Sequence, residues 1–163
     1  LSKALRLPLR FPGSPGAYRS IYQATDAKLL GRAANWALTS PKTTDQAYNI
    51  TNGDFFRWEQ IWEKVVDLFD LPIGPPQSIS LQQFMADKTS TWRELAEVHG
   101  LVTPDIEKAV NWSFGDYIFN CDWDIMASTT KARQHGFESF EDSEHMFSQI
   151  LTEMAQARMI PPL

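Results

Sequence analysis

The sequence predicts an α+β fold that is mostly helical and has a few short strands. Apolar residues recur at helical spacing along most of the chain, and the broadest stripe runs from Phe55 to Phe69. Two short segments, 7–11 and 47–51, have strand character instead. The order strand, helix, strand and then mainly helices is typical of a layer in which helices dominate.

The first third of the chain is predicted to hold a strand and a helix. The apolar run 7–11 is closed by a loop rich in proline and glycine at 12–16, and residues 18–24 are expected to be extended. Asp26 is predicted to cap a helix that Pro41 ends. The residues expected on its inner face are Leu29, Leu30, Ala33, Trp36 and Ala37.

Segment 47–51 alternates like a strand, and a turn at Asn52-Gly53 follows it. Asp54 is predicted to cap the helix 55–69, which Pro72 and Gly74 terminate. Its inner stripe is expected to comprise Phe55, Trp58, Ile61, Trp62, Val65, Val66 and Phe69.

The remaining elements are predicted to be helices at 80–87, 90–99, 112–119 and 129–135. Gly100 and Gly136 are expected to end the second and the last of these, and Pro104 to begin another helix toward Val110. Ser143 is predicted to cap the final helix, whose inner residues are Phe147, Ile150, Leu151 and Met154. We expect one domain, with a strand, helix and strand in 1–54 and a helical cap in 55–163.

Composition excludes several classes of function. The 163 residues carry 15 Lys and Arg against 20 Asp and Glu, and the basic residues gather on no stretch, which argues against a nucleic-acid partner. No apolar run approaches the roughly 20 residues of a membrane helix, and no signal peptide opens the chain. The lone cysteine, Cys121, favours a reducing, cytoplasmic location.

The chain lacks the motifs of nucleotide binding and of common catalysis. Its eight glycines are scattered, without a GxGxxG, a Walker A or a GxSxG sequence. No metal site is expected, because no histidine has a partner at ligand spacing; the surface is the preferred place for His99, His135 and His145. Asp122 and Asp124 are interpreted as solvated, and Cys121 as inert and partly buried.

The aromatic segment 111–119 is the strongest candidate for function. Its residues suit core packing, and they equally suit the apolar wall of a ligand pocket finished by a few polar groups such as Ser113 and Tyr117. Periodicity does not separate the two interpretations.

Three stretches resemble the C-terminal half of the extended short-chain dehydrogenase/reductases, within the NAD-dependent epimerase/dehydratase superfamily. They are Asp26 to Leu30 with the alanine-rich helix that follows, Ala47 to Asp54, and Lys131 to Phe137. In detail the pattern is similar to the progesterone 5β-reductase/iridoid synthase-like group. The marks are Leu9-Arg-Phe-Pro-Gly13, Asn49-Ile-Thr-Asn-Gly-Asp-Phe-Phe-Arg-Trp58, Trp112-Ser-Phe-Gly-Asp116 and the closing His135-Gly-Phe.

This resemblance implies a parent enzyme that uses NADPH to deliver hydride to the β-carbon of an activated enone, or to a related carbonyl substrate. In the group, the glycine-rich fingerprint and the catalytic Tyr and Lys lie upstream of the Leu-Arg-Phe-Pro-Gly stretch. No catalytic or cofactor-binding residue therefore maps onto this sequence. The chain is expected to be the substrate-binding C-terminal part without its Rossmann half, inactive and free of cofactor when alone.

The resemblance also implies a substrate site. Phe114 matches an aromatic residue that lines the family's steroid or monoterpenoid cavity, with Trp112 and Tyr117 as its neighbours. Ser113 stands where a second Trp is common in the plant members, so the substrate preference does not carry over. The implied partners are a small apolar enone or carbonyl compound and the missing Rossmann half, with a homodimer as a further option.

Three hypotheses follow. A piece of a reductase is favoured by the motifs and by a first residue that is Leu rather than Met, and it predicts an exposed apolar docking surface. A stand-alone, non-catalytic module would use the stripe 55–69 for a lipophilic ligand or for dimerisation. A self-contained hydrolase or metal enzyme is the least favoured, because no nucleophile with its base can be named.

Overall fold

The computed structural model describes all 163 residues. The α-helices are α1 Pro15–Arg19, α2 Ala27–Thr39, α3 Trp58–Leu68, α4 Leu81–Met85, α5 Thr89–His99, α6 Ile106–Ala109, α7 Trp112–Phe119, α8 Thr130–Gln134 and α9 Ser143–Gln156. The two-residue strands are β1 Leu9–Arg10, β2 Ile21–Tyr22, β3 Phe56–Arg57 and β4 Ile73–Gly74, and a 3-10 helix, η1, covers Pro41–Thr43. The predicted α+β fold with dominant helices is confirmed.

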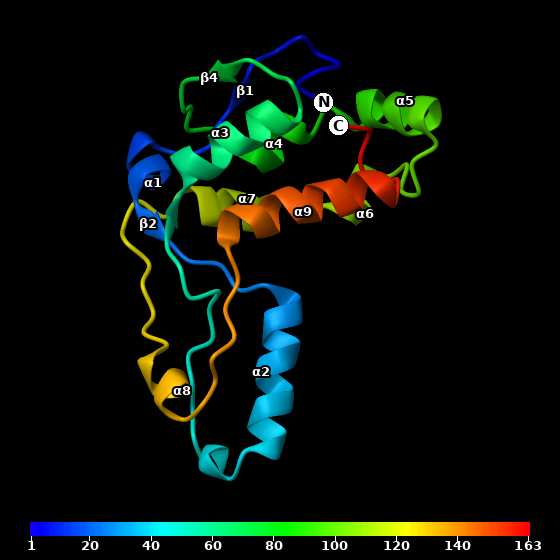
Figure 1. Cartoon of the computed structure of the whole chain (residues 1–163). Helices are drawn as coiled ribbons and strands as arrows, with labels where there is room; N and C mark the ends of the chain where they lie inside the picture. Colours follow the sequence, from blue (N-terminus) through cyan, green and yellow to red (C-terminus); the bar gives the residue numbers. More distant parts are fainter.

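The helices form two groups (Figure 1). The larger group holds α3 to α7 and α9, with β1 and β4 beside α3, and both chain ends lie together near α5. The smaller group holds α2, η1 and α8, and extended segments join it to the first. None of the helices combines the length and the apolar character that a membrane-spanning helix needs.

Two small sheets tie distant segments together. β1 pairs in parallel with β4, with Leu9 opposite Ile73, and β2 pairs antiparallel with β3, with Tyr22 opposite Phe56. Pairs this short are marginal by themselves. Their positions must therefore be held by the packing around them.

Three separate apolar clusters provide that packing. The first, around α3, comprises Phe11, Ala17, Phe56, Trp58 and Ile61. The second, around α5, comprises Met85, Trp92, Ala96, Leu101 and Ile106, and the third, between α2 and α8, comprises Leu29, Ala33, Ala132 and Phe137. In the first cluster Phe11 lies edge-on to Trp62 and Phe119 at ring centroid separations of 5.3 Å, which joins the N-terminal segment, α3 and α7.

Helices with strong local signals are where the sequence places them. Asp26 caps α2 by accepting a hydrogen bond from the amide of Leu29 at 2.9 Å, and Pro41 follows its end. Gly100 ends α5 in the left-handed conformation, with φ of +61°. The segment 112–119 is helical, and 7–11 contains β1.

The strand predicted at 47–51 is wrong. These residues are extended but pair with no strand. Their alternation has another cause: Tyr48 and Ile50 pack against the third cluster, while Asn49 between them is exposed. A similar correction applies to 18–24, where α1 begins at Pro15 and includes Tyr18, so that only Ile21 and Tyr22 are a strand.

Several predicted caps are displaced. α3 begins at Trp58, not after Asp54, and the Gln60 side chain accepts a hydrogen bond from the amide of Arg57 at 2.9 Å. Pro104 does not begin α6, because Asp105 caps it by accepting from the amide of Glu107. Asp142, not Ser143, caps α9. The starts of α3 and α6 differ from the predicted starts by at least two residues, and the cap of α9 differs by one residue.

The buried faces of helices α2, α3 and α9 contain fewer residues than predicted. Leu29 and Ala33 of α2 are buried, whereas Leu30 and Ala37 are exposed. Phe55 precedes α3 and is exposed, and Ile150 of α9 is exposed too. Leu30 lies one position from the buried Leu29, and because each residue turns the helix by about 100°, its side chain points past the edge of the contact. Ala37 and Ile150 each lie four positions after a buried residue, where the contact along the helix has ended.

Candidate functional site

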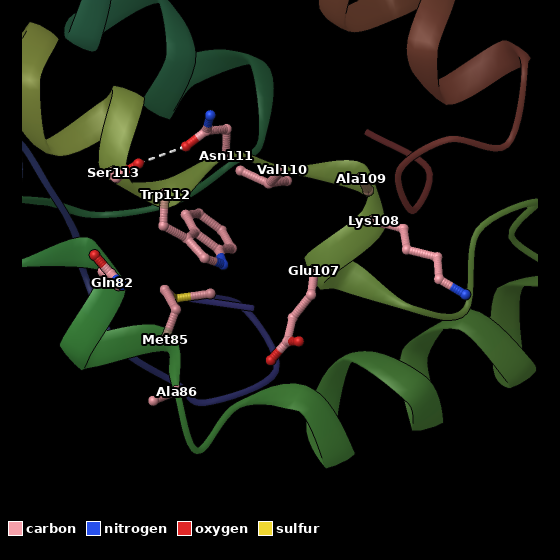
Figure 2. Close-up of a pocket in the computed structure, with 10 residues that line it drawn as sticks. All are labelled: Gln82, Met85, Ala86, Glu107, Lys108, Ala109, Val110, Asn111, Trp112 and Ser113. Carbon is pink, nitrogen blue, oxygen red and sulfur yellow. Dashed lines mark hydrogen bonds between the residues drawn. The ribbon is translucent and has the colours of Figure 1, made fainter.

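α7 carries the predicted site and is fixed at its start by Asn111. The Asn111 side chain accepts hydrogen bonds from the amide of Phe114 at 3.1 Å and from the hydroxyl of Ser113 at 2.7 Å. Figure 2 shows the second of these bonds. The cap satisfies amides that the first turn leaves unpaired, so α7 begins at Trp112.

The Gly115-Asp116 pair then holds α7 against α4. A Cβ on Gly115 would lie 2.9 Å from Leu81 Cδ1, so the helices approach closely at this point. The Asp116 carboxylate accepts hydrogen bonds from the Ser80 hydroxyl at 2.9 Å and from the amides of Leu81 and Gln82. Asp116 therefore acts as the cap of a neighbouring helix and sets the direction of α7.

The structure does not bring the three predicted site residues together. Phe114 and Tyr117 share one side of α7, where 62% and 64% of their surfaces are exposed. Trp112 points to the other side and packs against the second apolar cluster. A helix turns by about 100° per residue, so the helix predicted at 112–119 already separates Trp112 from Phe114; the grouping of the three aromatic residues did not take this geometry into account.

Trp112 borders a hollow of about 750 Å³ between α4 and the segment from α6 to α7. Figure 2 shows its ring at the centre of the lining residues, with Glu107 at the rim and the Lys108 side chain directed away. The hollow is open and half of its lining is polar. The complete lining is Gln82, Met85, Ala86, Glu107, Lys108, Ala109, Val110, Asn111, Trp112 and Ser113.

Trp112 also borders a second, more apolar space. Two cavities of about 690 and 490 Å³ share Leu1, Ser2, Leu9, Trp62, Met85 and Trp112, and we name them together the Trp62–Trp112 groove. The indole N–H of Trp62 is buried and has no hydrogen-bond partner. The helical spacing predicts Trp62 in the inner stripe of 55–69, and nothing in the sequence indicates this groove.

The histidines and acidic residues offer no catalytic pair. His99 and His145 are exposed, as expected. His135 is partly buried, with its Nδ1 2.6 Å from the hydroxyl of Tyr48. Asp124 accepts a hydrogen bond from the amide of Ile21 at 2.9 Å, which is a structural role. No group of three or more His, Cys, Asp and Glu side chains lies close enough together to hold a metal ion.

Cys121 is 2% exposed, and its thiol donates to the carbonyl oxygen of Tyr117 at 3.4 Å. Burial raises the pKa of the thiol, and the negative charge of Asp122 raises it further. Both effects disfavour the reactive thiolate.

We therefore expect Cys121 in the folded chain to react with iodoacetamide at pH 8 at least about tenfold more slowly than in urea. The raised pKa of the thiol and its burial both slow the reaction. Mass spectrometry of timed samples gives both rates. Equal rates would show that the thiol is accessible and ordinary.

The Thr51-Asn-Gly-Asp54 stretch, part of the sequence resemblance, forms a network of hydrogen bonds between two helix starts. Asn52 is fully buried; its side chain accepts from the amide of Asp26 at 2.6 Å and donates to the Ser143 hydroxyl at 3.0 Å. Asp54 accepts from the amide and the hydroxyl of Ser143 at 2.8 and 2.7 Å. The stretch thus joins the start of α2 to the start of α9.

The starts of three helices do not fit the pyrophosphate of a dinucleotide. A pyrophosphate binds where glycines bring it onto free amides at the start of a helix. Here amides in the first turns of α2, α7 and α9 are already bonded to Asp26, Asn111 and Asp142. The two carboxylates would also repel a phosphate.

Comparison with known proteins identifies the relatives of the chain. No protein-family model matches it. It is 31% identical to an (S)-8-oxocitronellyl enol synthase of Nepeta cataria and 30% identical to that of Catharanthus roseus, in each case over 94% of this chain and 40% of the relative. It is 32% identical to an enol synthase of Nepeta racemosa over 94% of this chain and 39% of that protein.

The chain thus spans about two fifths of the length of the curated relatives that it matches. The match extends over nearly all of the elements described above, and these include the Thr51-Asn-Gly-Asp54 stretch and α7. This confirms the resemblance seen in the sequence: the chain is similar to iridoid synthase-like enzymes, and its match to about two fifths of their length is consistent with a C-terminal portion of the progesterone 5β-reductase/iridoid synthase family.

Proposed function

We propose that this chain is the substrate-binding portion of an NADPH-dependent reductase that acts on an apolar enone or carbonyl compound. The observation that carries the proposal is the match over 94% of the chain to proteins named as (S)-8-oxocitronellyl enol synthases. We further propose that residues 1–163 act as one domain in which 55–163 form the cap, and that the protein is cytoplasmic, in keeping with its lone thiol.

Phe114 and Tyr117 are proposed to form a wall of the substrate pocket. Trp112, which lies on the other side of α7 beside the hollow in Figure 2, is proposed to support this helix from behind. Two aromatic side chains held outward on a rigid helix are unfavourable in water, and covering each would contribute about 2 kcal/mol. An apolar substrate between this face and the remaining portion of the enzyme would cover them. The exposed face of α7 supports this proposal.

The division of labour follows from what the chain contains. When bound in the intact enzyme, NADPH would supply the hydride, and no residue of this chain is proposed to hold it. The aromatic face would hold the enone in place and exclude water while negative charge develops on the carbonyl oxygen. We expect no turnover from the chain alone, because none of the family's cofactor-binding or catalytic residues maps onto this sequence.

The proposal is tested by fusing the chain to the portion of the Nepeta cataria relative that it does not match. We expect the fusion to oxidise NADPH with progesterone as the enone, and Phe114→Ala to lower kcat/KM about tenfold or more, because a lost ring in an apolar pocket costs about 1–3 kcal/mol. Thermal melting should be nearly unchanged, since Phe114 packs little in the free chain.

Phe140→Ala is the matched control, because Phe140 is 73% exposed and lies outside α7. It should leave kcat/KM unchanged. Equal activity of the fusion and of both variants would exclude a wall at Phe114. A folded fusion that never consumes NADPH with enones or carbonyl compounds would overturn the reductase proposal.

The alternative is a stand-alone module that binds a lipophilic ligand or dimerises. One observation favours it: the Trp62–Trp112 groove has the size of a small-molecule pocket and a largely apolar lining. Binding of progesterone by the chain alone, measured by quenching of tryptophan fluorescence, would favour this module.

A further inference from the structure

We propose that the Asn52-Gly53 pair is a deamidation site that the fold keeps closed, and that deamidation there converts an unfolded chain into one that cannot refold. The proposal goes beyond the proposed function and is independent of it, because it concerns only the hydrogen bonds between the starts of α2 and α9. Asn52 is the one asparagine of the chain that a glycine follows.

An asparagine followed by glycine is labile because glycine has no side chain to shield its backbone nitrogen. That nitrogen, once it has lost its proton to a base, attacks Cγ of the preceding asparagine. The new N–Cγ bond closes a succinimide ring, and the side-chain amide leaves as ammonia. Water then adds to either ring carbonyl and opens the ring, which gives aspartate or isoaspartate without any oxidation or reduction.

The fold requires both residues of the pair. Gly53 has a φ of +100°, and a Cβ there would lie 3.0 Å from Nη2 of Arg133 and 3.3 Å from Cβ of Phe140. A side chain is therefore strained at this position. Asn52 is fully buried and joins the starts of two helices. A more durable pair could not replace Asn52-Gly53 without loss of stability.

The folded chain protects the pair by holding Asn52 still. Its Oδ1 accepts from the amide of Asp26 at 2.6 Å, and its Nδ2 donates to the Ser143 hydroxyl at 3.0 Å and to Sδ of Met146 at 3.3 Å. The backbone N–H and C=O of Asn52 are bonded as well, whereas the Gly53 amide donates no hydrogen bond. Protection therefore depends on the Asn52 side chain, whose Cγ cannot turn toward the Gly53 nitrogen while these bonds persist.

The products do not fit the site. An aspartate in place of Asn52 has no hydrogen to donate to the Ser143 hydroxyl, whose own hydrogen is directed to Asp54. It also adds a second carboxylate next to that of Asp54 at a fully buried position, where a charge without a partner is strongly unfavourable. Isoaspartate lengthens the main chain by a carbon atom, which displaces the backbone bonds of this residue. We therefore expect the deamidated chain to remain unfolded.

The first experiment compares deamidation in the folded and the unfolded chain. Both are kept at pH 8, one in buffer and one in guanidinium chloride, and mass spectrometry with peptide fragmentation follows Asn52 and Asn49 over time. We expect conversion at Asn52 to be at least about tenfold slower in the folded chain, because it then requires opening of the network. Asn49 is the internal control: it is exposed, but the β-branched Ile50 follows it, so it should remain intact in both samples.

The second experiment tests the consequence by refolding. Chain kept unfolded at pH 8 is diluted out of guanidinium chloride and compared by circular dichroism with chain kept unfolded for the same time at pH 5, where little base is present to start the reaction. We expect the refolded fraction to fall in step with conversion at Asn52. Asn52→Asp, which is one of the two products, should unfold at a lower guanidinium concentration or not fold, whereas Asn49→Asp should unfold like the wild type.

Three results would overturn the proposal. Equal conversion of Asn52 in both samples would show that the fold does not protect the pair. An unfolded chain that keeps Asn52 intact would remove the site. Deamidated chain, or Asn52→Asp, that folds as completely as the wild type would show that the network accepts a carboxylate. None of these measurements involves turnover, so the reductase proposal stands or fails separately.

Discussion

Replacing Gly13 by alanine is expected to destabilise the chain by about 3 kcal/mol or more, or to prevent folding. A Cβ at this position would lie 1.8 Å from the carbonyl oxygen of Phe119 and 2.6 Å from the ring of Phe11. The first neighbour is backbone at the end of α7, so a side-chain rotation cannot relieve the contact. The turn after β1 and α7 would have to separate, which would open the first apolar cluster.

Urea unfolding followed by circular dichroism measures the change. Gly31→Ala is the matched control: Gly31 lies inside α2, is exposed, and a Cβ there would have no neighbour within 4 Å. Since alanine favours the helix, this variant should gain about 0.5–1 kcal/mol. A Gly13→Ala variant as stable as the wild type would show that the segments from Phe11 to Gly13 and α7 do not approach as described.

The contrast between the two glycines shows which parts of the fold the sequence could predict. Helices are governed by contacts within about four residues, so Asp26, Pro41 and Gly100 gave correct limits for α2 and α5. The close approach at Gly13 depends on a carbonyl more than 100 residues away, and its only sequence signal was the Leu-Arg-Phe-Pro-Gly resemblance.

The wrong predictions for 47–51 and Asp54 also arise from contacts between segments that are distant in the sequence. Segment 47–51 alternates as a strand does, but a strand requires a partner, and its neighbours are side chains of α2 and α8. Asp54 has the chemistry of a helix cap and does hold the start of a helix. The helix is α9, through Ser143, instead of the one that follows in sequence.

The candidate site was predictable in composition but not in arrangement. The resemblance selected the helix 112–119, and the structure forms it with Asn111 as its cap. The side on which each ring lies is set by Gly115 and Asp116 against α4, which are contacts between elements. Trp62 was missed as a groove residue for the same reason: its free N–H is visible only once its neighbours are in place.

Asn52→Leu is expected to cost about 1–3 kcal/mol although leucine fills nearly the same volume. The variant leaves the amide of Asp26 without its acceptor, and an unpaired buried group costs about 1–3 kcal/mol. The Ser143 hydroxyl loses the hydrogen bond from Asn52 but keeps the one that it donates to Asp54. Asn49→Leu, an exposed amide whose Nδ2 donates to the Ser128 carbonyl at 3.3 Å, should change stability by less than about 0.5 kcal/mol.

The hydrogen bonds around Asn52 also predict energetic coupling between side chains, because Ser143 is held by both Asn52 and Asp54. If the three side chains act as one unit, Asn52→Ala and Ser143→Ala will not be additive, and a double-mutant cycle by urea unfolding should give a coupling of about 1 kcal/mol or more. Additive losses would mean that the starts of α2 and α9 are held independently. The family's Thr-Asn-Gly-Asp sequence would then need an explanation other than the joining of these two helices.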